Sequence, residues 1–112
     1  MRVADIILEQ LGGHKFVVMT GSKNFVADGD TLRMNLARNA SKANRLWITL
    51  DADDTYTMRF FKYTAGGWKV DHKKQTVVEK PEKIEEVKTY KGIYCDQLQE
   101  LFTETTGMYT HL

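Results

Sequence analysis

The chain has 112 residues, of which 42% are hydrophobic and 28% charged, with one proline, eight glycines and a formal net charge of +1. This composition is typical of one globular domain over residues 1–112, and it excludes a disordered or low-complexity chain. A net charge so close to zero gives no overall attraction to nucleic acids or membranes, and no stretch approaches the roughly 20 apolar residues that a membrane helix needs.

The single cysteine, Cys95, excludes an internal disulfide and favours a reducing compartment. The first residues carry an acid at Asp5 and no long apolar run, so they lack the pattern of a signal peptide. We therefore expect a soluble, cytoplasmic protein that does not bind membranes.

Apolar residues at helical spacing predict a first helix over 3–11. Its apolar face comprises Val3, Ile6, Ile7 and Leu11. Gly12 and Gly13 follow directly, at the place where a left-handed residue commonly ends a helix. The next segment, 15–19, is β-branched and aromatic with successive apolar residues, which predicts a strand covered on both sides. A short strand piece is expected at 25–26.

Three segments between residues 32 and 60 alternate between apolar and polar side chains. The apolar sets are Leu32, Met34 and Leu36; Leu46, Ile48 and Leu50; and Tyr56, Met58 and Phe60. Alternation in three successive segments predicts an antiparallel meander with one face on the core. A three-residue loop at 52–54 would place Leu50 opposite Tyr56, and this register keeps both apolar sets on one face.

After the turn signalled by the glycine pair at 66–67, a further strand is predicted over 68–71. The following stretch, 72–91, is rich in Lys and Glu around a few valines and isoleucines. We expect it to form a protruding hairpin that returns as a strand near 86–90. A short helix across 82–87 is the alternative.

A second helix is predicted over 94–105 by its periodicity. Its apolar face comprises Tyr94, Leu98, Leu101, Phe102 and Thr105. Cys95 lies beside that stripe and is expected to pack as a small hydrophobe rather than to act as a nucleophile. The predicted fold class is therefore α+β, an antiparallel meander sheet of about five strands with a helix at each terminus.

Segments at both ends and one strand carry a resemblance to known sequences. They are Ile7-Leu8-Glu9-Gln10-Leu11-Gly12-Gly13 running into 16–21, the strand 47–50, and Gly92-Ile93-Tyr94-Cys95-Asp96-Gln97-Leu98 with the end 102–112. The chain resembles a group of small uncharacterised proteins encoded by bacteriophages and integrated mobile elements, relative to which 75–86 looks like an insertion. The resemblance implies a phage-type protein acting in a bacterial cytoplasm on nucleic acid or on a host or phage protein. It assigns no functional residue.

Motifs of common catalytic and metal sites are missing from the sequence. The glycine pairs lack the spacing of a phosphate-binding loop, and the acidic turn 51–54 lacks the glycine and the distal acid of a calcium loop. His14, His72 and His111 are scattered, without a ligand-spaced partner. A Cys95–His111 pair is the remaining catalytic alternative. We otherwise expect a non-enzymatic protein without a metal or cofactor.

The face of the sheet that points away from the predicted core carries interleaved arginine and aromatic side chains. By the same alternation it holds Arg33, Asn35, Arg45, Trp47, Thr49, Arg59, Phe61 and Tyr63. The expected register puts Trp47 beside Arg59, and Arg45 beside Phe61. Most of these residues lie in or near segment 31–50, which has four basic residues and no acidic one.

Rings that stack on bases, next to guanidinium groups that meet phosphates, are typical of single-strand binders. The leading hypothesis is therefore a binding domain that takes single-stranded nucleic acid on this face. The predicted binding residues are Arg33, Arg45, Trp47, Arg59, Phe61 and Tyr63.

Two alternatives remain open at the level of sequence. A helix lying over Trp47 and Phe61 would make them a second small core, with arginines at its rim. The same residue types are also favoured at protein interfaces. A protein-binding accessory factor, or an inhibitor of a host or phage protein, is therefore the alternative function.

Overall fold

The computed structural model describes residues 3–110. Within this range the chain forms α1 (Val3–Leu11), α2 (His14–Thr20) and α3 (Leu98–Thr106), with a short 3-10 helix, η1 (Cys95–Gln97), directly before α3. The strands are β1 (Lys23–Asp28), β2 (Thr31–Asn35), β3 (Arg45–Leu50), β4 (Tyr56–Thr64), β5 (Gly67–Asp71), β6 (Thr76–Lys80) and β7 (Lys83–Ile93). The predicted α+β class, with a helix at each end, is confirmed.

Five strands form one antiparallel sheet in the order β1-β2-β3-β4-β7, and β5 pairs with β6 in a separate two-stranded ribbon. The predicted register between β3 and β4 is confirmed, because Leu50 lies opposite Tyr56 and Trp47 lies opposite Arg59. Alternation specifies this register because a slip by one residue would turn every apolar side chain of a strand to the other face.

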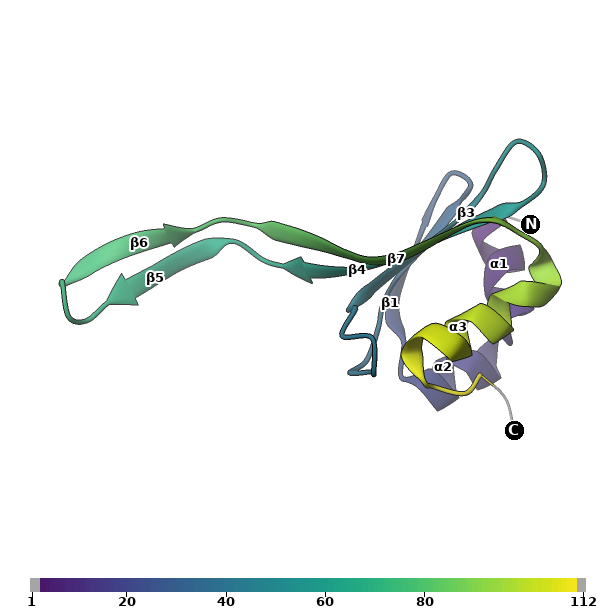
Figure 1. The fold of residues 1–112 in the computed structure, drawn as a ribbon, viewed down its shortest axis with the longest axis horizontal. Coiled ribbons are helices and arrows are strands. Elements are labelled where there is room, and N and C mark those ends of the chain that lie inside the picture. The colour runs from purple at the N-terminus through teal and green to yellow at the C-terminus, as the bar shows by residue number, and fades with distance from the viewer. Residues whose placement is uncertain (1–2, 111–112) are drawn as a thin grey trace.

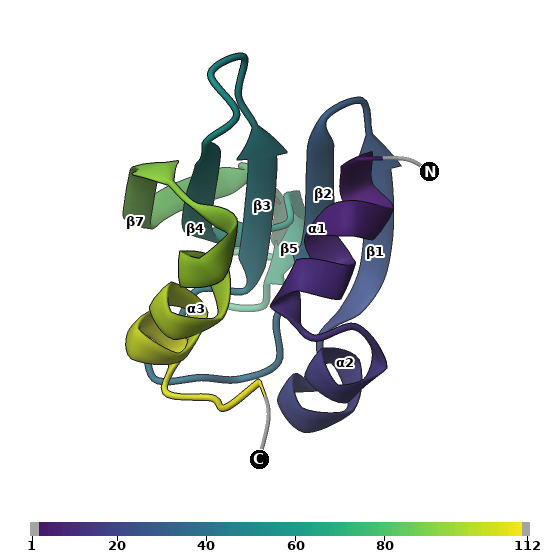
Figure 2. The same ribbon diagram turned by 90° about the vertical axis from the view of Figure 1, so that its right-hand side faces the viewer.

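All three helices lie on the same face of the sheet (Figure 2). The core between the two layers is built from the inward side chains of the strands and the buried faces of the helices. Its fully buried members include Ile7, Leu11, Phe16, Met34, Leu46, Ile48, Met58, Phe60, Leu98 and Phe102. Phe102 of α3 joins the elements, with ring centroids 4.9 Å from Phe16 and 6.3 Å from Phe60.

The segment 15–19, predicted as a strand, is instead part of helix α2. Gly13 at φ 59° lets the chain turn sharply and begin a new helix directly after α1. Phe16 and Thr20, four residues apart, are buried on one side of this helix, whereas Val18 is exposed. Val17, Val18 and Thr20 are β-branched and Phe16 is aromatic, a composition typical of a strand, and tertiary packing overrides that propensity.

Some predicted helix faces also need correction. Ile6 of α1 is 37% exposed, and its place in the core is taken by Ala4. Tyr94 precedes η1 as its cap and is exposed, so it does not belong to the apolar face of α3. Cys95 was predicted to pack, but it is exposed because η1 turns it outward. His111, its suggested partner, lies outside the described residues.

The ribbon β5–β6 projects from the body on the side opposite the helices, and the long axis of the molecule measures 54 Å against 32 and 23 Å (Figure 1). Strands β4 and β7 lead into it, and their pairing shifts register between Phe60 and Phe61. Such bulges bend a strand pair and increase its twist. The predicted protruding hairpin is confirmed, and the alternative helix at 82–87 is replaced by β7. Within residues 3–110 no helix is long and apolar enough to cross a membrane.

Candidate functional site

The structure places all six predicted site residues on the face of the sheet opposite the helices, which we call the open face. They are Arg33 on β2, Arg45 and Trp47 on β3, and Arg59, Phe61 and Tyr63 on β4. No helix of the described chain lies over them, since α1, α2 and α3 are all on the other side (Figures 1 and 2). The alternative in which a helix lies over Trp47 and Phe61 is therefore wrong for the described chain.

Guanidinium groups and rings contact one another across the strands. Arg33 and Trp47 are cross-strand partners, with the guanidinium carbon 4.1 Å from the ring centroid. On the other flank Arg59 lies 5.4 Å from the Trp47 centroid and 4.4 Å from that of Phe61. Such cation–π contacts stabilise exposed sites by about 0.5–1 kcal/mol each. The stacked groups are thereby held in place before any ligand arrives.

The rings of the open face differ in their access to solvent. Phe61 is only 3% exposed, although it is outside the main core. Trp47 and Tyr63 are partly exposed. Trp47 and Tyr63 therefore each keep part of their surface open to a ligand, although Arg33 and Arg59 lie over the Trp47 ring. Of these two rings, it is Trp47 that Phe61 contacts in an edge-to-face pair. Alternation predicted the face of each ring but not its depth.

Two of the three arginines form ion pairs that the sequence pattern did not predict. Arg33 pairs with Asp28 at the end of β1, and Arg59 pairs with Glu86 of β7, whose Oε1 accepts from Arg59 Nε at 2.7 Å. Hydrogen bonding to Arg59 lowers the pKa of Glu86, and the same contact raises the pKa of Arg59. Arg45 instead donates to the carbonyl oxygen of Asn44 at 3.1 Å. The only hint of an acidic partner for Arg59 in the sequence is that Glu86 lies in the charged stretch 72–91. The register of that stretch against β4 was not predictable.

A hollow of about 250 Å³ lies at the corner where the open face meets the base of the ribbon. It is lined by Arg45, Trp47, Arg59, Phe61, Tyr63, Glu82 and Ile84. Partial desolvation and the neighbouring Glu82 carboxylate raise the pKa of Tyr63. A hydrogen bond to Glu82 contributes to the same rise in pKa, so the Tyr63 hydroxyl faces that carboxylate. The hollow combines apolar ring surface with arginine and carboxylate groups.

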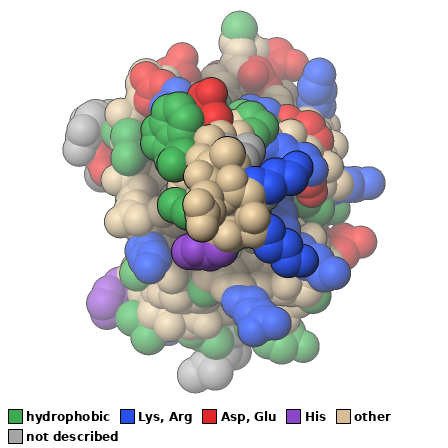
Figure 3. Space-filling model, turned by 90° about the vertical axis from the view of Figure 1, so that its left-hand side faces the viewer, with side chains coloured by type: hydrophobic (Ala, Val, Ile, Leu, Met, Phe, Trp, Pro, Cys, Tyr) green, Lys and Arg blue, Asp and Glu red, His purple; other side chains and the backbone are tan. Residues whose placement is uncertain are grey.

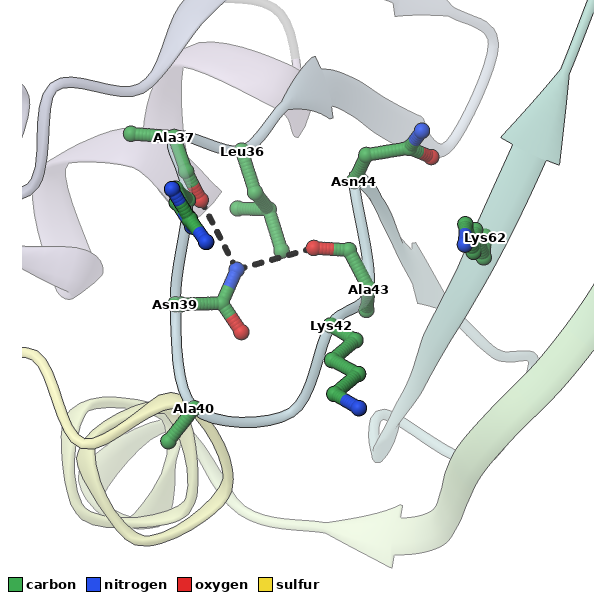
Figure 4. A pocket seen from close by; sticks show the side chains of 9 residues that line it. Leu36, Ala37, Asn39, Ala40, Lys42, Ala43, Asn44 and Lys62 are labelled. Carbon is green, nitrogen blue, oxygen red and sulfur yellow. Dashed lines mark hydrogen bonds between the residues drawn. The ribbon is translucent and has the colours of Figure 1, made fainter.

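A second, larger hollow of about 530 Å³ lies at the end of the sheet, beside the loop that joins β2 to β3 (Figure 4). Three of its lining residues are cationic, Arg38, Lys42 and Lys62, and none is acidic. Arg38 and Lys42 belong to the acid-free segment of the sequence, but no role was predicted for them. Such a lining favours an anion over a cation.

The loop around this hollow is fixed by the side chain of Asn39, whose Nδ2 donates to the carbonyl oxygens of Ala37 and Ala43 at 2.8 Å each (Figure 4). Asn44 ties the loop to β4, because it donates to and accepts from the backbone of Tyr63. The same short segment thus positions both the basic hollow and the ring of Tyr63 on the open face.

Among residues 3–110 no group of three His, Cys, Asp or Glu side chains is placed to hold a metal ion. Comparison of the chain with protein-family models, with curated proteins and with solved structures finds no match.

Proposed function

We propose that the protein is a non-enzymatic binding domain that takes single-stranded nucleic acid on its open face. The supporting observation is the pair of partly exposed rings, Trp47 and Tyr63, on a sheet surface that also carries three arginines. No helix within residues 3–110 covers this surface. Every base has a π-face, so such rings bind single strands with little regard to sequence. We also propose that the protein is encoded by a phage or mobile element, as the resemblance of its end segments suggests.

Base stacking contributes most of the binding free energy in this proposal. Each stacked base adds about 1–3 kcal/mol. The arginines contribute less, since Arg33 and Arg59 first have to exchange Asp28 and Glu86 for phosphates. Exposed ion pairs of this kind are worth about 0–1 kcal/mol, so the exchange costs little. With at most three phosphate contacts, log K should fall with log salt at a slope no steeper than about −2.

A protein partner is the second candidate function, and the charge balance of the open face favours it. The three arginines are matched by three carboxylates, those of Asp28, Glu82 and Glu86. A neutral surface with aromatic anchors and a polar rim is typical of a protein interface. In this case the protein would be an accessory factor or an inhibitor of a host or phage protein.

Fluorescence polarisation separates the two candidates. Labelled single-stranded DNA, RNA and duplex DNA of equal length are titrated with the wild-type protein, with Trp47→Ala and with Tyr109→Ala. Tyr109 is a matched control, because it is an exposed ring that follows α3 and lies outside the strands of the open face. We expect preference for single strands, and a loss of about 5- to 150-fold in affinity in Trp47→Ala alone. Equal loss in Tyr109→Ala, or no binding by the folded wild type, would contradict the proposal.

A further inference from the structure

The ribbon carries an apolar stripe with no cover in the described chain. Trp68 is 74% exposed, and Val70 and Val77 are more than half exposed. Val70 lies opposite Val77 and two positions from Trp68, so all three share one face of the ribbon. A two-stranded ribbon is marginally stable in water by itself. Large exposed apolar side chains in such an element mark an interaction surface.

A third hollow, of about 460 Å³, lies at the base of this ribbon. Its lining includes Tyr63, Trp68, Glu79, Lys80 and Glu82. Tyr63 and Glu82 also line the hollow on the open face, so the two hollows adjoin. Trp47, Tyr63 and Trp68 therefore follow one another along a continuous surface that leads from the sheet onto the ribbon.

Gly66 shapes the floor of the third hollow, at the point where the ribbon leaves the sheet. A Cβ at this position would lie 3.0 Å from the carbonyl oxygen of Lys80 and 3.0 Å from the backbone nitrogen of Glu82. These are backbone atoms that cannot move aside easily, so a glycine is required for the two strands to approach closely here. The close approach holds together the two strands that carry Trp68 and Glu79 into this hollow.

We propose that the ribbon forms the second half of the binding site, so that a single strand stacked on Trp47 and Tyr63 continues onto Trp68. This inference rests on the proposed function of the open face. A protein anchor needs one well-packed cluster, whereas three accessible rings in succession match the successive bases of a strand. Trp68 was predicted to lie in a strand, but no role was predicted for it.

Charges along the ribbon fit a strand that is held mainly by stacking. Lys80 lines the third hollow together with the carboxylates of Glu79 and Glu82. Farther out, the tip carries Lys73 and Lys74, both with exposed side chains. Seen from the tip, most of the nearby Lys and Arg side chains gather to the right of the view, whereas hydrophobic and acidic side chains lie together above and to the left (Figure 3). Phosphates can thus follow the basic side while bases lie on the rings.

The two tryptophans of the chain, Trp47 and Trp68, allow a direct test. Trp47→Phe leaves Trp68 as the reporter, and Trp68→Phe leaves Trp47. Each protein is titrated with oligothymidines of about 4 and about 16 nucleotides, the span of site sizes seen for single-strand binders. We expect both lengths to quench Trp47 and only the longer one to quench Trp68. Trp68→Ala should weaken binding of the longer strand by about 5-fold or more and leave the shorter unchanged.

The outcomes separate this inference from the proposed function. Quenching of Trp47 by both lengths with a silent Trp68 would overturn the ribbon site and leave the open-face site standing. Silence of both reporters would overturn both. If neither strand binds while Trp68→Ala abolishes self-association in light scattering, the ribbon is a protein interface instead. Thermal unfolding provides the control, since removal of a 74%-exposed ring should leave the Tm of Trp68→Ala unchanged.

Discussion

Trp47 on β3 and Phe61 on β4 form an edge-to-face pair, with ring centroids 5.3 Å apart and ring planes at 83°. Phe61 is buried beneath the surface, whereas Trp47 is partly exposed above it. Arg59 contacts both rings. The pair therefore divides into a supporting ring and an accessible ring, and this division leads to the first prediction.

Phe61→Ala should act on stability and Trp47→Ala mainly on binding. Deleting a buried phenylalanine ring costs about 3–5 kcal/mol in free energy of unfolding. Trp47 keeps part of its surface in water, so its removal should cost clearly less. Urea unfolding of both variants measures the difference. If Trp47→Ala destabilises the protein as much as Phe61→Ala does, Trp47 is a packing residue and loses its assigned role.

Glu86→Gln should strengthen binding of single strands. The substitution removes the carboxylate that holds Arg59 and leaves its guanidinium available for a phosphate. Because Arg59 no longer has to give up an exposed ion pair of about 0–1 kcal/mol, affinity should rise by up to about 5-fold, while the slope of log K against log salt stays the same. Glu85→Gln is the matched control, because Glu85 is an exposed neighbour that pairs with Lys83 at 2.7 Å. A gain of the same size in both variants would show that net charge alone matters.

The same ion pair should make stability depend on acid pH. Its bond to Arg59 lowers the pKa of Glu86 in the folded protein below the ordinary value of 4.5. The contribution of the ion pair to the free energy of unfolding is therefore present above that value. It is lost as the pH falls through the folded-state pKa of Glu86. The difference in urea midpoint between wild type and Glu86→Gln should shrink from about pH 5 to about pH 3. A difference that stays constant over this range would show that the pair does not stabilise the fold.

Asn39→Ala should loosen the loop between β2 and β3. The Asn39 side chain donates to two backbone carbonyls and accepts from the Ser41 backbone nitrogen at 3.0 Å. Leaving these partly buried groups without a partner should cost about 1–3 kcal/mol in free energy of unfolding. Lys42→Ala, which removes an exposed side chain of the same loop, should stay within about 0.5 kcal/mol of wild type. Equal effects in denaturant unfolding would contradict the role of Asn39.

The sheet and its open face were predictable because period-two alternation is a strong constraint wherever one face is buried. A slip in the pairing of β3 with β4 would expose Ile48 and Met58, so only one register was compatible with the apolar pattern. The same alternation, by itself, predicts that all six candidate site residues share one face. A short segment such as α2 contains too few residues for its periodicity to distinguish a helix from a strand. In α2, two valines in seven residues indicate a strand, and only contacts such as Phe16 with Phe102 stabilise a helix there.

The details of the candidate site depend on long-range placement that local patterns do not encode. The pairing of Arg59 with Glu86 joins residues 27 positions apart across a bulged strand pair. The basic hollow is lined by Lys62 of β4 together with residues of the loop that ends at Asn44, far away in the sequence. Trp68 was placed correctly in a strand, but its exposure depends on a ribbon that nothing else in the described chain covers.

Chemical-shift mapping by NMR tests the central claim most directly. Amide resonances of the protein are recorded while a short oligothymidine is added at low salt. We expect the largest shifts on β3 and β4 around Trp47, Arg59 and Tyr63, and no change in α1, α2 and α3. Shifts centred on the helices, or a spectrum that a single strand leaves unaltered, would contradict a nucleic-acid site on the open face.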